Sequence, residues 1–316
     1  MKPTLTVQMS KVSSKQAIDG VLLVNKPQGL SSNAVLQKVK RLYHAEKAGH
    51  TGSLDPLATG MLPVCFGEAT KFSQYALEDD KTYEATGLLG IKTTTSDSMG
   101  EVLARVEAVH VTKERLQATI EEFIGVSHQT PSMFSALKHN GTPLYKYARN
   151  GIDIERAARA ITIKELLLLD FDGQQFKIRV SCSKGTYIRN LVEDIGDKLG
   201  TGAHVTQLHR LHTSGYSEYP MHSLESLQAA NQMQLTACLL PMETTVRHFP
   251  SMQLTDEELA NLRLGRVISP VNAMACTTEI RLYDSKGQFA GLGAFDESGV
   301  FKVKRLLSEQ AFRARE

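Results

Sequence analysis

Along most of the chain, short segments consist either of consecutive apolar residues or of alternating polar and apolar residues, and both patterns are typical of strands. Continuous apolar runs are typical of buried strands, and alternation of polar and apolar residues is typical of half-buried ones. The pair Asp172-Gly173 between two such segments is a strong hairpin signal. The predicted strands of this part lie at residues 20–24, 61–66, 81–90, 161–171, 175–182 and 205–211.

Helical spacing of apolar residues appears between these strands. Ser31 or Ser32 can cap a first helix, Thr112 can cap a second, and Gly200 can end a third that begins near residue 188. A short helix is expected near residues 144–148. Strands joined by hairpins and interspersed with helices predict an α+β fold, with a mixed, mostly antiparallel sheet and flanking helices.

The two ends of the chain differ in character from the middle. Residues 1–19 are polar without periodicity, and we expect a flexible N-terminal tail there. Residues 20–248 would form the main domain, and residues 249–316 a small β-rich C-terminal domain with a helix at 256–264. Its three strands are expected near residues 278–283, 288–295 and 300–306.

Residues 48–60 contain three glycines and a proline, which exclude a regular helix and disfavour a long strand there. The stretch reads as a stiff loop that carries His50 and Asp55 and runs directly into an apolar strand. A carboxylate on a rigid loop backed by a strand is a common way to hold a nucleophile or a base. From spacing alone, an Asp beside Pro is more often the start of an Asx-turn, and both roles stay open at this point.

Composition narrows the classes of function. The four cysteines are far apart, which disfavours a disulfide framework and a zinc site and fits a cytoplasmic protein. No apolar run has transmembrane length, and neither a P-loop nor a dinucleotide-binding glycine motif occurs. The net charge is only +2, but residues 138–164 contain six bases against two acids. A second basic cluster at residues 38–47 lies on the other side of the loop, and together they favour a phosphate-binding surface.

The loop sequence Gly49-His50-Thr51-Gly52-Ser53-Leu54-Asp55-Pro56-Leu57-Ala58-Thr59-Gly60 resembles the catalytic loop of the TruB family of pseudouridine synthases at every fixed position. The resemblance covers residues 20–216 and implies a pseudouridine synthase fold. It makes Asp55 the essential nucleophile and Arg189 its partner, which would keep the carboxylate ionised by lowering its pKa. The C-terminal part resembles, more loosely, a reduced PUA-type RNA-binding domain.

The same resemblance assigns further residues to substrate binding. Tyr83 would stack on the target base, and Tyr187 and Leu208 would form the walls of the uracil pocket. His50 would contact the region of the flipped nucleotide, and Lys26 lies in the family's N-K-P motif near the active site. We interpret residues 204–212, which hold three histidines, as a strand edge near RNA phosphate rather than a metal site.

The resemblance implies isomerisation of a uridine in the T-arm of tRNA, the one conventionally numbered 55. The reaction needs base flipping but no cofactor or metal, and an RNA-binding insertion at about residues 131–164 would close over the T-loop. No membrane and no obligate protein partner are implied. Two alternatives stay open: a non-catalytic RNA-binding chaperone for tRNA folding, and a synthase of the same fold that acts on another RNA.

Overall fold

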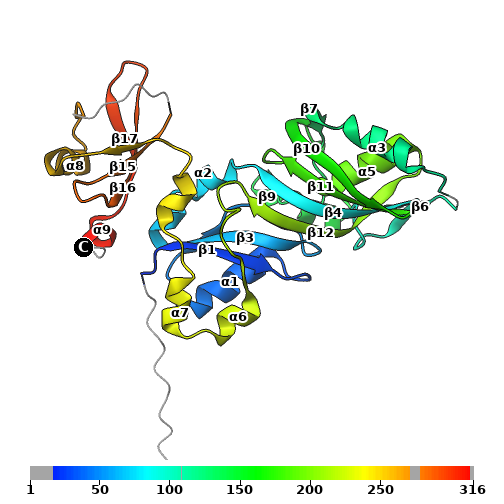
Figure 1. Cartoon of the computed structure of the whole chain (residues 1–316), viewed down its shortest axis with the longest axis horizontal. Helices are drawn as coiled ribbons and strands as arrows, with labels where there is room; N and C mark the ends of the chain where they lie inside the picture. Colours follow the sequence, from blue (N-terminus) through cyan, green and yellow to red (C-terminus); the bar gives the residue numbers. More distant parts are fainter. Residues whose placement is uncertain (1–16, 108, 271–277, 314–316) are drawn as a thin grey trace, which may run out of the picture.

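The computed structural model describes residues 17–107, 109–270 and 278–313, and nine strands of this part form one sheet (Figure 1). These strands are β1 (Gly20–Lys26), β2 (Ala48–His50), β3 (Thr59–Phe66), β4 (Lys81–Leu89), β7 (Gly125–Gln129), β10 (Arg159–Phe171), β11 (Gln175–Cys182), β12 (Ala203–Thr213) and β13 (His222–Ser223). Their order is β13-β1-β3-β12-β4-β11-β10-β7, and β2 pairs with β3. The pairs β1–β13 and β3–β12 are parallel and the others antiparallel, so the predicted mixed, mostly antiparallel sheet is confirmed.

The helices begin and end where local signals place them. The Ser31 side chain accepts a hydrogen bond from the Ala34 amide at 3.1 Å, and Thr112 caps its helix in the same way. Gly200 ends another helix with φ of 77°, a conformation that favours glycine. The helices are α1 (Ser32–Leu42), α2 (Ser73–Leu77), α3 (Lys113–Glu121), α4 (Leu144–Arg149), α5 (Ile188–Leu199), α6 (Leu224–Ala229), α7 (Gln232–Ala237), α8 (Asp256–Arg263) and α9 (Glu309–Arg313), with 3₁₀ turns η1 (Gly67–Lys71) and η2 (Met242–Val246).

Strand β1 separates two apolar cores because successive side chains point to opposite faces of a sheet. Leu22 and Val24 pack with α1, α6 and α7 on one face. Val21 and Leu23 face the other side and belong to a core shared with the C-terminal strands. None of the helices within the described residues is long and apolar enough to span a membrane.

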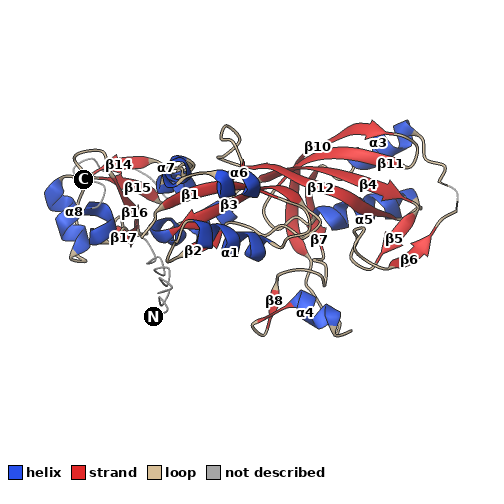
Figure 2. Cartoon of the chain, turned by 90° about the horizontal axis from the view of Figure 1, so that it is seen from below, coloured by secondary structure: helices blue, strands red, loops and turns tan. Residues whose placement is uncertain are grey.

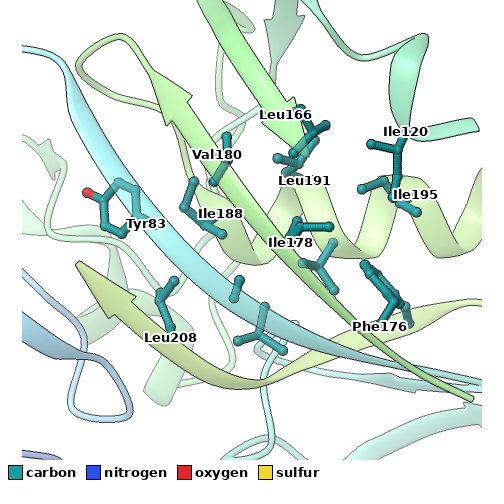
Figure 3. Packing of buried hydrophobic residues seen from close by; sticks show 14 of the residues in the cluster. Tyr83, Ile120, Leu166, Phe176, Ile178, Val180, Ile188, Leu191, Ile195 and Leu208 are labelled. Atoms are coloured by element: carbon teal, nitrogen blue, oxygen red, sulfur yellow. The ribbon is translucent and has the colours of Figure 1, made fainter. Parts of the chain in front are cut away.

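A third core lies between the other half of the sheet and helices α3 and α5 (Figure 3). Phe176 and Ile178 of β11 and Leu191 and Ile195 of α5 are buried at its centre. Burial of each such side chain contributes roughly 1.5–3 kcal/mol to folding. Tyr83 lies at the end of this core, so the apolar packing also fixes the strand that carries it.

The C-terminal domain contains a second sheet, ordered β14-β15-β16-β17, which confirms the predicted β-rich domain (Figure 1). Phe289 makes an edge-on contact with Phe72 at 5.3 Å between ring centroids, and Lys71 donates to the Leu306 carbonyl at 3.2 Å. These contacts join the second sheet to η1 and the residue that follows it, in the domain of the nine-stranded sheet. The strands are β14 (Ser251–Gln253), β15 (Ile280–Tyr283), β16 (Phe289–Phe295) and β17 (Phe301–Leu306).

Two small hairpins extend from the large sheet. The pair β8 (Lys138–His139) and β9 (Thr142–Pro143) leads into α4, and Figure 2 shows β8 and α4 projecting from the body of the chain. The other hairpin is β5 (Ile91–Thr93) with β6 (Val102–Arg105). Residues 1–16 of the predicted tail lie outside the described residues, whereas Asp19 accepts a hydrogen bond from the Glu68 amide at 2.6 Å.

Strand β12 is not a sheet edge, so the interpretation of residues 204–212 as an edge near phosphate is wrong. β12 lies between β3 and β4 because it pairs with both. His204 Nδ1 is hydrogen-bonded to the Ile91 carbonyl at 2.9 Å, and His209 Nδ1 to the Thr59 hydroxyl at 2.8 Å. Both rings therefore take part in the internal structure of the sheet.

Candidate active site

The loop between β2 and β3 is held by the strands and by α1. Ser32 Oγ accepts from the Leu54 amide at 2.7 Å and donates to the Leu54 carbonyl at 3.0 Å, which fixes the residue before Asp55. Leu54 and Leu57 are buried in the same core as Tyr83. The loop ends at Gly60, with φ of 99°, where a Cβ atom would lie 2.2 Å from the Arg210 carbonyl oxygen. Only glycine fits this close approach, and the loop is consequently rigid.

Asp55 and Arg189 form an ion pair, as the sequence predicts. Arg189 Nε lies 2.8 Å from Asp55 Oδ2, and the Arg189 side chain is 4% exposed whereas that of Asp55 is 38% exposed. Arg189 also donates to the Thr95 and Phe134 carbonyls, both at 2.9 Å. Its planar guanidinium is thus fixed on several sides, and the carboxylate that it holds stays open to solvent on one side.

The pKa of Asp55 differs from the expectation. Burial of the carboxyl raises its pKa above the ordinary value, while Arg189 and Lys26 lower it and Asp97 raises it further. Arg189 therefore acts on the pKa of Asp55 in the predicted direction, but the effect of burial is larger and the net direction is upward. The ion pair offsets part of the desolvation rather than all of it.

Asp97 is a second carboxylate at the site, and the sequence did not indicate it. Its Oδ2 lies 3.5 Å from Arg189 Nη1, and its side chain is 6% exposed. Asp97 Oδ1 accepts hydrogen bonds from the Thr95 hydroxyl at 2.6 Å and the Met99 amide at 2.9 Å. Asp97 therefore holds Arg189 at Nη1, whereas Asp55 contacts Nε. In the sequence, Asp97 is only one acidic residue in a polar loop, and nothing there indicates a contact with Arg189.

For the activity that the sequence resemblance implies, Asp97→Asn is expected to reduce the single-turnover rate about 10- to 100-fold, because Arg189 would lose one of its two carboxylate partners. The rate is measured under saturating enzyme, so weaker substrate binding does not enter. Asp197→Asn is the matched control: it removes a carboxylate that pairs with Lys92 at 2.8 Å on the surface of α5. An equal loss of rate in both variants would contradict a specific role for Asp97.

Two of the predicted pocket residues share a core with the loop that carries Asp55. Tyr83 and Leu208 are buried and belong to one core with Leu57 (Figure 3). Burial raises the pKa of the Tyr83 phenol, and the charge of Arg210 offsets part of this effect. Tyr187 precedes α5, where its amide donates to Gln129 Oε1 at 2.7 Å. Burial raises the pKa of Tyr187, and the negative charge of Asp55 raises it further.

Lys26 is fully buried, in contrast to a lysine of a solvent-exposed turn. Its Nζ donates to the Pro27 and Leu30 carbonyls at 2.9 and 2.6 Å. Burial lowers the pKa of Lys26 to about 8, although the charge of Asp55 acts in the opposite direction. Burial, followed by the charge of Arg210, also lowers the pKa of His50, so this imidazole is neutral at pH 7. Lys26 contributes a positive charge beneath the loop, and His50 does not.

The insertion predicted at about residues 131–164 is linked to the Asp55–Arg189 pair. Phe134, at its start, accepts a hydrogen bond from Arg189 Nη2, and the Asn190 side chain donates to the Thr130 carbonyl at 3.1 Å. Lys138 lies in β8, and Lys146 and Arg149 lie in α4. The projecting arm of Figure 2 is thus anchored at the active site and carries bases at its far end.

Three family models match successive parts of the chain. Residues 40–188 match the TruB family pseudouridylate synthase N-terminal domain, and residues 189–247 match the tRNA pseudouridylate synthase B C-terminal domain. Residues 250–307 match the pseudouridine synthase II TruB C-terminal model. The matches therefore extend over both sheets.

Curated relatives are similar over nearly their whole length. A protein named tRNA pseudouridine synthase B from Legionella pneumophila (strain Lens) is 55% identical over 300 residues, which cover 95% of this chain and 99% of the relative. A protein of the same name from Coxiella burnetii (strain RSA 331 / Henzerling II) is 48% identical over 300 residues, with coverage of 94% and 97%.

Solved structures show the same fold at low sequence identity. A chain in the crystal structure of a Cbf5-Nop10-Gar1 complex superposes with a TM-score of 0.73 at 24% identity, covering 93% of this chain and 86% of that chain. A chain of the archaeal box H/ACA sRNP Nop10-Cbf5 complex gives a TM-score of 0.67 at 22% identity, with coverage of 97% and 96%.

The family match and the curated relatives define a pseudouridine synthase, an isomerase. The chain belongs to the TruB family of these enzymes, as the sequence resemblance predicts.

Proposed function

We propose that the enzyme isomerises uridine 55 in the T-loop of tRNA to pseudouridine, with Asp55 as the nucleophile. The observation that carries this proposal is the contact of Asp55 with the buried Arg189 at 2.8 Å, on a rigid loop beside Tyr83. The relatives named tRNA pseudouridine synthase B support tRNA as the substrate. The proposal also places the enzyme in the cytoplasm.

The reaction breaks the C1′–N1 bond of the uridine, turns the base and joins it again through C5, which loses its proton. It is redox-neutral: the C1′–C5 bond replaces the C1′–N1 bond, the Asp55 carboxylate is regenerated at the end, and the C5 proton passes to a base of the pocket, a role for which Tyr83 is the candidate. The Asp55 carboxylate acts as the nucleophile, and Arg189 orients it. Tyr83 stacks on the base, and Leu208 and Tyr187 form the walls that retain the detached uracil.

The target base must leave the folded T-arm to reach Asp55. The basic arm, which is anchored at Phe134 and carries Lys146 and Arg149, would close over the T-loop and bind its phosphates. The C-terminal domain would contact the acceptor stem. His50 is assigned to the flipped nucleotide region, and Lys26 to the electrostatics beneath the loop.

Tritium release from a tRNA transcript labelled with [5-³H]uridine tests the proposal, because C5 loses its hydrogen only when the base is rejoined there. We expect release to reach one tritium per transcript. A transcript with cytidine in place of uridine 55 is the control and should release none.

Each rival function has its own outcome in this experiment. Tight tRNA binding without release would contradict the proposed activity and leave an RNA-binding chaperone or a synthase of the same fold that acts on another RNA. Release that persists from the cytidine transcript would contradict uridine 55 as the modified position.

A further inference from the structure

Arg210 is a buried cation in β12, and its side chain contacts the loop that carries Asp55. Its side chain is 1% exposed. In β12 it lies opposite Gly60 of β3 on one side and opposite Tyr83 of β4 on the other. Tyr83 and the end of the loop that carries Asp55 are therefore both its direct neighbours.

The guanidinium of Arg210 bonds to the loop at both ends. Nε donates to the Met61 carbonyl at 2.6 Å, and Nη2 donates to the Gly52 carbonyl at 3.2 Å. Gly52 precedes Asp55 and Met61 follows it, so one planar group spans the whole catalytic segment. The main chain of Arg210 closes the same end of the loop, since it lies too near Gly60 for any side chain there.

The charge of Arg210 has no ordinary structural explanation. No ion pair between Arg210 and a carboxylate occurs within residues 17–107, 109–270 and 278–313. A buried charge without a counterion is costly, and an apolar side chain would hold a central strand equally well. The same charge acts on three predicted site residues: burial raises the pKa of Tyr83 and lowers those of Lys26 and His50, and in each case the charge of Arg210 acts downward.

We propose that Arg210 is a positioning residue of the reaction: its guanidinium ties the Gly52 and Met61 carbonyls together and so fixes Asp55 relative to Tyr83. Arg210 is buried beneath the loop, so it acts on the substrate only through the loop and Tyr83. This inference rests on the proposed role of Asp55 as the nucleophile.

Arg210→Lys tests the proposal because it keeps the positive charge but replaces the planar fork by a single ammonium. We expect the single-turnover rate of tritium release to fall about 100-fold, the effect of a misplacement of about 1 Å. The dissociation constant for tRNA should change less than about 3-fold, because Arg210 makes no contact with RNA in this proposal.

Hydrogen exchange of the free enzyme gives a readout that does not depend on catalysis. Amides of residues 51–60 should exchange at least about 10-fold faster in Arg210→Lys, while those of α5 should not change. Arg115→Lys is the matched control, since it makes the same replacement at a guanidinium that donates to the Leu199 carbonyl at 3.0 Å, outside the loop. Arg115→Lys should keep both the rate and the loop exchange of the wild type.

The outcomes separate this inference from the proposed function. A wild type without tritium release would overturn the function, whereas an active wild type with equally active Arg210→Lys and unchanged loop exchange would overturn the inference. A rate loss matched by an equal loss of affinity would also overturn it. Arg210→Gln is made in parallel, and failure of both variants to fold would assign Arg210 to the core instead.

Discussion

Replacement of Asp55 by asparagine is expected to reduce tritium release at least about 10⁴-fold, because an amide oxygen cannot replace a carboxylate as nucleophile. The variant should remain folded. Arg189 would keep Asp97 as a carboxylate partner at 3.5 Å, so the buried guanidinium is not left without a counterion. The measurement is single-turnover release from [5-³H]uridine-labelled tRNA at saturating enzyme.

Thermal unfolding and tRNA binding are the controls for this variant. Because burial raises the pKa of Asp55 in the folded state, the folded enzyme binds its proton more tightly than the unfolded chain. Stability from this group is then lost as the pH rises through the folded pKa, and Asp55→Asn should not lower the unfolding temperature at pH 7. A release rate above about one tenth of the wild type would refute Asp55 as the nucleophile.

The parts of the fold that could be predicted from the sequence are those specified by a few neighbouring residues. The Ser31 cap, the Asp172-Gly173 turn and the Gly200 stop depend on a few neighbouring residues, and each lies where it was expected. The Asp55–Arg189 pair was also predicted, but only through the family resemblance. Spacing alone left an Asx-turn as the more common role of Asp55.

The residues around that pair depend on the order of the strands, which no local pattern specifies. Arg210 is 149 positions from Met61 along the chain, and they meet only because β12 inserts between β3 and β4. Asp97 reaches Arg189 through a hydrogen-bonded loop far from α5 in sequence. The pKa of Asp55 depends in addition on burial, which the identity of its partner does not determine.

Arg189→Lys is expected to lower the single-turnover rate about 10²- to 10³-fold. The lysine retains the charge but cannot contact Asp55 while also donating to the Thr95 and Phe134 carbonyls. The Asp55 carboxylate would lose its fixed orientation, and Phe134 at the start of the basic arm would lose its hydrogen bond to Arg189. Arg179→Lys is the matched control, because Arg179 pairs with Glu84 at 2.8 Å on the more exposed side of the sheet. It should retain the wild-type rate.

Arg189→Met separates the charge of Arg189 from its geometry. Arg189 lowers the pKa of Asp55, so its removal should raise that pKa further above the ordinary value of about 3.9. At a given pH a larger fraction of Asp55 would be protonated, and the acidic limb of the pH–rate profile should move to higher pH relative to the wild type. A rate loss of equal size at every pH would mean that Arg189 acts through orientation alone. A limb displaced to lower pH would contradict the electrostatic coupling, because loss of a neighbouring cation cannot favour the carboxylate.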